Sequence, residues 1–247
     1  THNTNYNNNG QIKLLFTVIK VKKQNSLSYE NASENIYNLM PLKNGLNISI
    51  ALQDKRGKQT IGIKLKLVDT SVIKYDKMRL YLHRDTVNEK QMKQMIEEFA
   101  IFANSFIGEY LKIHLDGIGI FRTCDATAIT GDNFNELTGN ELLHHIITNG
   151  ISADYMNTVA SHDLVGSKEY THFTSPIRRY ADLLVHRAIR SLIRGSKKVS
   201  NVHRVEGAKP LPTKVIYPYE EEQLQATGEH LSVTERRADE ATRDVVN

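Results

Sequence analysis

Cysteine is almost absent from this sequence, and its scarcity excludes two kinds of site. Because Cys124 is the single cysteine in 247 residues, no intrachain disulfide can form and no zinc site can be built from thiolates. Long apolar runs are also missing, since none approaches the roughly 20 residues that a membrane-spanning helix needs. The polar N-terminus carries no pattern typical of a secretory signal. These absences predict a cytoplasmic protein that does not enter a membrane.

Neither sign of charge dominates the chain. Lysine and arginine number 32 against 28 acidic residues, which gives a net charge of +4 and a pI near 9.0. This mild excess permits a polyanionic partner but does not require one. The placement of individual charges must therefore decide whether the chain binds an anion.

The hydrophobic pattern predicts one folded region after a short linker. Residues 1–11 are mostly asparagine and other polar residues, and we interpret them as a linker, whereas 12–247 contain no internal repeat. The strongest signal is a helix at 88–111, in which Met and Phe recur at three- and four-residue spacing. Other patterns predict helices at 27–40, 136–148, 219–229 and 233–246, neighbouring strands at 61–67 and 77–83, and a long loop at 195–219. Ser232 and Glu235 have the capping-box spacing that would begin the last helix.

Two groups that could carry chemistry are better explained as structural. His144 and His145 are adjacent, so they point to different faces of the helix and do not form a two-ligand metal site by themselves. Cys124 has no histidine close to it in sequence, which favours a structural thiol over a nucleophile. Neither group is therefore assigned as a metal site or a nucleophile, and no metal ligand is assigned within this chain.

The segment at 170–190, YTHFTSPIRRYADLLVHRAIR, carries the clearest signals. Ser175 before Pro176 is typical of a helix start, because the hydroxyl can cap the helix and proline is tolerated at the first helical position. Gly195 is typical of the end of this helix. The predicted helix would place Arg178 and Arg179 in its first turn.

Two arginines in a first turn are unusual, since the helix N-terminus already carries partial positive charge. They make sense if an anion such as phosphate binds there, held by free backbone N–H groups and a guanidinium together. The alternative is that Arg178 and Arg179 pair with carboxylates from elsewhere in the fold, and the residues alone leave both explanations open. Asp182 and His186 are four residues apart on this helix, so they can pair with each other or with Arg187, and we favour this structural role over catalysis.

The same segment resembles the signature of the RNB family, the catalytic domain of ribonuclease II and ribonuclease R. The likeness extends over H-F-T-S-P-I-R-R-Y, the following aspartate and the V-H-R sequence. Residues 96–104, 119–122 and 235–244 resemble further family segments in the same order, and 235–244 is most similar to the ribonuclease R branch. The resemblance covers about residue 12 to the C-terminus. It implies an α+β fold, a mixed sheet flanked by long helices, of which this chain is the C-terminal portion.

The resemblance also implies a function and roles for particular residues. RNB enzymes are processive, Mg²⁺-dependent 3′-to-5′ exoribonucleases that hydrolyse single-stranded RNA to nucleoside 5′-monophosphates. Arg178 resembles the arginine that steadies the scissile phosphate, and it is the one catalytic residue expected here. The residues expected to bind RNA are His172, Thr174, Ser175, Arg179, Glu98, Tyr170, Arg236 and Arg243. Tyr170 could equally be a core residue.

The family's metal-binding aspartates are absent from this sequence. They lie in a D-x-D-D-like segment, whereas the aspartates here are isolated. We therefore expect the Mg²⁺ ligands and the flanking oligonucleotide-binding modules to lie outside this chain, and the chain alone to be inactive. The alternative is a non-catalytic RNB-fold module that binds RNA. Single-stranded RNA is the expected partner in either case, and membership of a larger RNA-decay complex stays open.

Overall fold

The computed structural model describes residues 20, 27–56, 71–76, 79–127, 137, 139–149, 151–195 and 219–246. They belong to two compact units. The larger comprises Leu27–Val185 and Tyr219–Asn247, and the smaller comprises Thr1–Ser26 and His186–Pro218. The predictions for residues 1–11 and 61–67, and for the interior of the 195–219 loop, fall outside the described residues. Within the described part of the chain, no helix has both the length and the apolar character needed to cross a bilayer.

Helix α4 (Val87–His114) confirms the helix predicted at 88–111. Thr86 begins it with a capping box: its side chain accepts a hydrogen bond from the Glu89 amide, and the Glu89 carboxylate accepts one from the Thr86 amide. The apolar stripe is largely buried, although Ile96 is half exposed. Two polar side chains, Glu98 and Asn104, are buried on α4, and Asn104 contacts the site described below.

The helix predicted at 27–40 is wrong in its extent, because the chain forms two helices there. Ser28 caps a single short helix, α1 (Tyr29–Glu34), by accepting a hydrogen bond from the Asn31 amide. After a turn, α2 (Met40–Arg56) begins with Pro41 in its first turn, where the missing N–H has no partner to lose. Both helices pack on α4 around a core that contains Ile36, Leu46, Met92 and Met95.

The described strands form two antiparallel pairs. Strands β1 (Ser71–Asp76) and β2 (Arg79–Arg84) pair with each other, so the strand predicted at 77–83 is present with its partner at 71–76. Strands β3 (Ile118–Thr123) and β4 (Asp154–Thr158) form the second pair. Directly after β3, Cys124 forms a parallel bridge with His162. Parallel and antiparallel pairing therefore occur side by side here.

The two C-terminal helices predicted at 219–229 and 233–246 are in fact one helix, α7 (Glu221–Val246). Ser232 is not an N-cap: it is buried mid-helix, donates to the Gly228 carbonyl and accepts a hydrogen bond from the Tyr155 amide. A β-carbon at Gly228 would lie 3.0 Å from the Tyr155 carbonyl oxygen, so glycine permits the close approach of β4. Ser232 and Gly228 therefore do not separate two helices; they allow α7 to pack against β4 at Tyr155.

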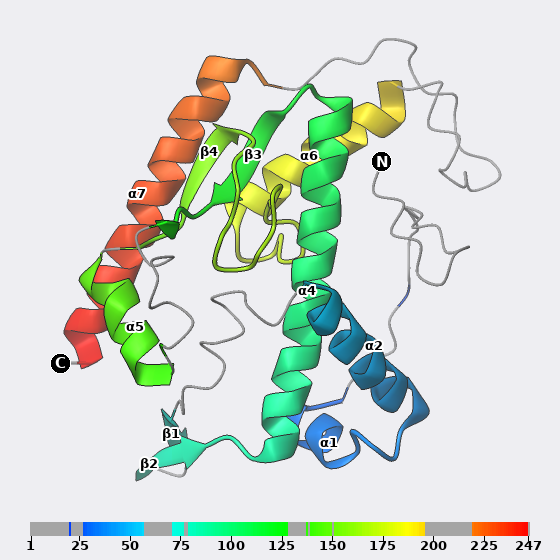
Figure 1. The fold of residues 1–247 in the computed structure, drawn as a ribbon, viewed down its shortest axis with the longest axis vertical. Coiled ribbons are helices and arrows are strands. Elements are labelled where there is room, and N and C mark those ends of the chain that lie inside the picture. Colours follow the sequence, from blue (N-terminus) through cyan, green and yellow to red (C-terminus); the bar gives the residue numbers. More distant parts are fainter. Residues whose placement is uncertain are drawn as a thin grey trace. The chain divides into compact units, whose positions relative to one another are not determined.

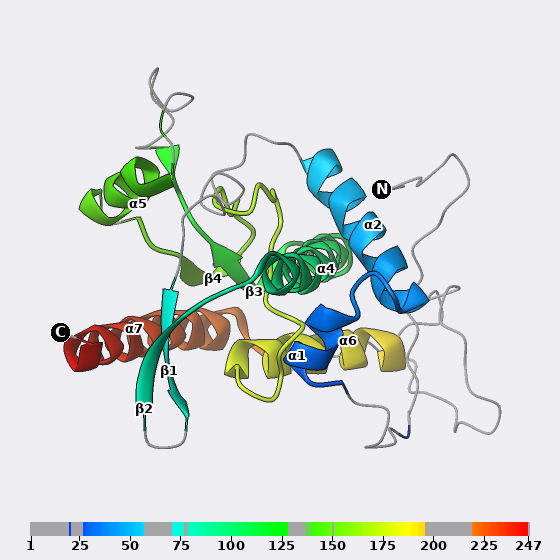
Figure 2. The same cartoon turned by 90° about the horizontal axis from the view of Figure 1, so that it is seen from below.

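Helix α5 (Gly139–Thr148) falls within the predicted 136–148 segment. Figure 1 shows the β3–β4 pair between α4 and α7, and both helices contact β3. Figure 2 looks almost along α4, with α1 and α2 on one side of it and β3, β4 and α7 on the other. This combination of long helices and paired strands confirms the α+β class.

Candidate functional site

The segment that carries the sequence signature runs beside β3. The Tyr170 carbonyl accepts a hydrogen bond from the Arg122 amide at 2.8 Å. The Thr171 hydroxyl, fully buried, donates to the Ile120 carbonyl at 2.6 Å. A β-carbon at Gly108 of α4 would lie 2.9 Å from the Glu169 carbonyl carbon and oxygen. Glycine in this long helix therefore lets the backbone of the segment pack directly on α4.

Asn104 fixes the segment to α4 through both ends of its amide. Its Nδ2 donates to the Tyr170 hydroxyl at 2.9 Å, and its Oδ1 accepts from the Phe173 amide at 3.0 Å. Asn104 is only 2% exposed. Because a buried amide without partners is costly, these two hydrogen bonds specify the path of residues 170–173.

Aromatic and imidazole rings pack around this path. The ring of His172 lies edge-on to the rings of Tyr155 and Tyr170, with centroids 5.6 and 5.9 Å away. Its Nδ1 is hydrogen-bonded to the Tyr155 hydroxyl at 2.7 Å. Burial, with the nearby charge of Arg179, lowers the pKa of His172 to about 3, and burial raises the pKa of Tyr155 to about 12. Both side chains are therefore neutral near pH 7 and serve as packing and hydrogen-bonding groups.

Arg122 connects this cluster to α7. Its guanidinium carbon lies 4.6 Å from the centroid of the Tyr155 ring, a cation–π arrangement. Its Nη1 also forms an ion pair with Glu235 of α7 at 2.5 Å. Arg122 therefore ties β3, β4 and α7 together behind the signature segment.

The turn at 175–179 differs from the prediction. Helix α6 (Tyr180–Gly195) begins five residues after Ser175, and its predicted C-terminal end at Gly195 is confirmed. The Ser175 carbonyl accepts hydrogen bonds from the amides of Arg178 and Arg179, so the two arginines precede the helix and do not lie in its first turn. Ile177, also in this turn, is fully exposed.

Asp182 accounts for this difference. Its side chain is 0% exposed and accepts hydrogen bonds from the Ser175 amide at 2.7 Å and from Arg179 Nε and Nη2 at 2.7 and 3.0 Å. Burial by itself would raise the pKa of Asp182, but these hydrogen bonds outweigh it and the pKa is lowered. Of the two explanations offered for Arg179, the structure shows the ion pair: its partner is the carboxylate of Asp182, three residues later in the chain.

Arg178 has a different environment. Its side chain is exposed, and it forms no ion pair within the part of the chain that the structure describes. Thr174, at the other end of the turn, is also exposed. Among the described residues, the turn thus presents to solvent a guanidinium without an ion pair, while Asp182 holds the neighbouring Arg179.

The remaining predicted residues are placed as follows. Glu98 is buried and forms an ion pair with Arg56 at 2.5 Å, and Arg56 also donates to the Val165 carbonyl. Arg236, half exposed, pairs with Asp154 at the start of β4 at 2.6 Å. Arg243 lies in α7, and its side chain is outside the described residues. The structure therefore gathers Tyr170, His172 and Arg179 into one cluster, whereas Glu98 and Arg236 have their own partners.

The carboxylates buried around this segment do not fit a magnesium site. Mg²⁺ requires several oxygen ligands in near-octahedral geometry. Asp182 is saturated by three N–H donors, and Glu98 is paired with Arg56. Both carboxylates are committed to separate structural contacts, so the cluster supplies no magnesium ligands from its buried acids.

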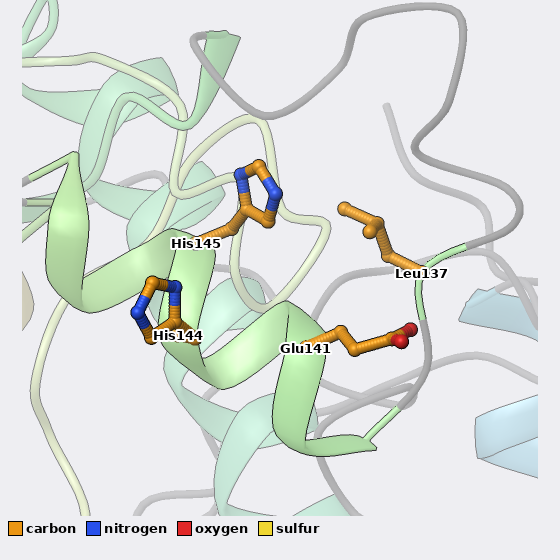
Figure 3. A pocket seen from close by; sticks show the side chains of 4 residues that line it. All are labelled: Leu137, Glu141, His144 and His145. Atoms are coloured by element: carbon orange, nitrogen blue, oxygen red, sulfur yellow. The ribbon is translucent and has the colours of Figure 1, made fainter.

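An open pocket beside α5 is lined by Leu137, Glu141, His144 and His145. Figure 3 shows the two imidazole rings projecting in different directions, with the Glu141 carboxylate turned toward Leu137. Both histidines are exposed, and their rings project in different directions (Figure 3), as their adjacency on the helix predicts.

Sequence reasoning missed three residues of the cluster: Asn104, Arg122 and Tyr155. Asn104 and Arg122 stand in apolar surroundings in the sequence, one in the α4 stripe and one at the end of β3. Asn104 ends the segment 96–104 and Arg122 ends the segment 119–122, and the resemblance of these segments to the family was the available signal for both. No signal in the sequence pointed to Tyr155, because its partners His172 and Ser232 lie 17 and 77 residues away.

Comparisons with known proteins agree on one family. The family model for the RNB domain matches residues 11–195. Ribonuclease R from Buchnera aphidicola subsp. Schizaphis graminum is 28% identical over 97% of this chain and 32% of its own length. The structure of Mycoplasma genitalium RNase R in complex with ribose-methylated single-stranded RNA matches with a TM-score of 0.56 at 18% identity, over 87% of this chain and 38% of that one.

The structure of yeast Ssd1, described as a pseudonuclease, matches with a TM-score of 0.53 at 20% identity, over 83% of this chain and 27% of that one. At such identities the structural matches establish the fold alone. The chain spans about a third of the length of the curated relative and of the RNase R structure that it matches.

Proposed function

Because this chain belongs to the RNB domain family, we propose that it forms the C-terminal part of the catalytic domain of a longer 3′-to-5′ exoribonuclease. The whole enzyme would hydrolyse single-stranded RNA processively to nucleoside 5′-monophosphates in the cytoplasm. The observation that carries the proposal is Arg178, an exposed guanidinium on the signature turn that forms no ion pair with any residue the structure describes. An arginine kept available in this way is suited to a phosphate.

In the proposed mechanism, Arg178 contacts the scissile phosphate and offsets the charge that develops on it in the transition state. Asp182 contributes indirectly. It holds the Ser175 amide and the Arg179 guanidinium and so fixes the turn from both sides. A fixed turn keeps the Arg178 backbone in one conformation, and a preorganised charge needs less rearrangement at the moment of reaction.

The other predicted residues differ in whether they can contact RNA directly. Thr174 and Arg236 are exposed and could contact the RNA backbone directly, as could Arg243. Ser175 and Arg179 are partly buried and shape the turn. His172 and Tyr170 act through packing and hydrogen bonds in the cluster beside the turn. Glu98, paired with Arg56, acts through its buried ion pair. The magnesium ligands are proposed to lie outside this chain, because its buried carboxylates near the turn are committed elsewhere.

The second candidate function is a non-catalytic module that binds RNA. One observation favours it: the fold matches a protein described as a pseudonuclease. In this case the exposed arginine would bind phosphate without any chemistry. The two candidates share the RNA-binding surface and differ in whether magnesium-dependent hydrolysis occurs.

The deciding experiment uses the longer protein that contains this chain and a 5′-labelled single-stranded RNA. The exoribonuclease proposal predicts Mg²⁺-dependent shortening from the 3′ end, release of nucleoside 5′-monophosphates and, in the presence of an RNA trap, no accumulation of intermediate lengths. Tight RNA binding without any shortening would support the non-catalytic module. Internal cleavage would contradict both candidates.

The 247-residue chain provides a matched control. It should bind the same RNA with an affinity that falls as salt rises, because phosphate contacts release counterions. It should release no nucleotide with Mg²⁺. Magnesium-dependent release of monophosphates by the chain alone would mean that its own carboxylates hold the metal, against the placement proposed above.

A further inference from the structure

The junction between β2 and α4 gathers three side chains of metal-ligand type. His83 lies near the end of β2, Asp85 in the connection and Glu89 in the first turn of α4. One ligand atom from each lies within 4.8 Å of the other two, and no other histidine, cysteine and carboxylate group in the described part of the chain meets this criterion. The three side chains are only 22%, 11% and 16% exposed.

Each carboxylate turns one oxygen toward the histidine because a neighbour holds the other. Glu89 Oε2 accepts a hydrogen bond from the Thr86 amide at 2.8 Å, and its Oε1 lies 3.2 Å from His83 Nε2. Asp85 Oδ2 is paired with Lys93 Nζ at 2.6 Å, and its Oδ1 lies 3.6 Å from the same His83 nitrogen. The helix cap and the lysine thus orient the two acids on a common point.

The separations of the two carboxylates from the imidazole nitrogen are close to those of ligands around one metal ion. Zinc binds imidazole nitrogen and carboxylate oxygen at about 2.0–2.2 Å, so two ligands lie about 3.4 Å apart at a tetrahedral angle and about 3.0 Å apart at a right angle. The two measured separations, 3.2 and 3.6 Å, fall close to this range. Little movement would be needed to admit an ion.

We propose that His83, Asp85 and Glu89 bind a divalent transition-metal ion, with Zn²⁺ as the expected ion. One imidazole and two carboxylates form a donor set suited to first-row divalent ions of this kind. Three protein ligands leave a fourth position to water. Because the ligands come from β2, the connection and α4, a bound ion would fix the β1–β2 pair to the start of α4.

The proposal does not depend on the exoribonuclease function, and the experiment that tests it measures metal binding alone. The 247-residue chain is titrated with Co²⁺, whose visible absorption reports its coordination, and bound Co²⁺ is then displaced by Zn²⁺. The expected result is one ion per chain, displaced stoichiometrically. His83→Gln and Glu89→Gln should each weaken binding by at least about 10-fold, the lower end of the loss seen when even an outer-shell partner is removed.

The variants are chosen to keep the fold. Glutamine at position 89 preserves the capping box, because glutamine also serves at this position, and circular dichroism without metal checks each variant. His145→Gln is the matched control, since it removes an exposed histidine near Glu141 in the pocket of Figure 3. Its metal affinity should equal that of the unmodified chain.

Three results would overturn the proposal. The first is no Co²⁺ binding at millimolar concentration. The second is unchanged affinity in Glu89→Gln, which would mean that the three groups form only an ordinary hydrogen-bonded cluster. The third is loss of binding in His145→Gln, which would place the ion at α5.

Discussion

The Asp182→Asn substitution should destabilise the larger unit strongly, because it disrupts the contacts that order the signature turn. Asp182 is fully buried and accepts three hydrogen bonds, two of them from the Arg179 guanidinium. Asparagine offers one acceptor oxygen in place of two and turns its NH₂ group toward a donor. Arg179 would then lose its countercharge while 18% exposed.

The size of the effect follows from burial. Breaking a buried ion pair by removing one partner costs about 3–5 kcal/mol, and the partial exposure of Arg179 favours the lower end. For a chain of this length, about 3 kcal/mol corresponds to a fall in Tm of roughly 6–12 °C. The matched control is Asp154→Asn, which breaks the Arg236–Asp154 pair, whose side chains are 50% and 41% exposed. Such surface pairs contribute about 0–1 kcal/mol, so this control should melt almost normally.

The assay is thermal unfolding followed by circular dichroism at several pH values. The pKa of Asp182 is lowered in the folded state, so its stabilisation is complete above the ordinary aspartate pKa, about 3.9, and is lost as pH falls through the lower folded value. The difference between the unmodified chain and Asp182→Asn should therefore be largest near neutral pH and shrink in acid. If Asp182→Asn is no more destabilising than Asp154→Asn, the buried pair does not order the turn and the reasoning is wrong.

Three further predictions concern the surroundings of the turn. Asn104→Ala should lower stability by about 2–4 kcal/mol, because the Tyr170 hydroxyl and the Phe173 amide both lose a buried partner; a urea unfolding curve with an unchanged midpoint would contradict this. Since burial holds the pKa of His172 near 3, far below the ordinary histidine value, the chain should lose stability as pH falls from about 6.5, and His172→Asn should reduce that loss in acid unfolding curves. Burial raises the pKa of Cys124 to about 11, so Cys124→Ser should leave turnover of the whole enzyme unchanged, and a folded variant without activity would show instead that the thiol takes part in catalysis.

The parts of the fold that sequence predicted well depend on local periodicity. Helix α4 was identified because its apolar residues recur at helical spacing over a length that no turn signal interrupts. The end of α6 followed from Gly195 for the same local reason. The family signature likewise identified the segment that contains Arg178, because its residues are contiguous in the sequence.

The errors occurred where a distant contact outweighed a local signal. Ser175 and Pro176 have the pattern of a helix start, yet the buried Asp182 carboxylate takes the Ser175 amide and the helix begins later. Ser232 has the spacing of an N-cap that would begin a new helix, but it lies inside α7 and accepts a hydrogen bond from the Tyr155 amide, 77 residues earlier. Gly228 likewise lets α7 approach Tyr155. No window of local sequence contains such a partner, so periodicity could not have predicted these contacts.

The most direct test of the central claim is Arg178→Ala in the whole enzyme, with single-turnover cleavage, RNA affinity and Tm measured on the same variant. If the exposed Arg178 guanidinium contacts the scissile phosphate, the cleavage rate should fall by roughly 10²–10³-fold, the scale for one preorganised charge stabiliser. RNA affinity should fall much less, since other phosphate contacts remain, and Arg178→Lys should rescue poorly because an ammonium lacks the bidentate fork. Tm should be nearly unchanged, because Arg178 forms no ion pair among the described residues. A variant that melts early yet cleaves at the normal rate would contradict the account and remove Arg178 from the active site.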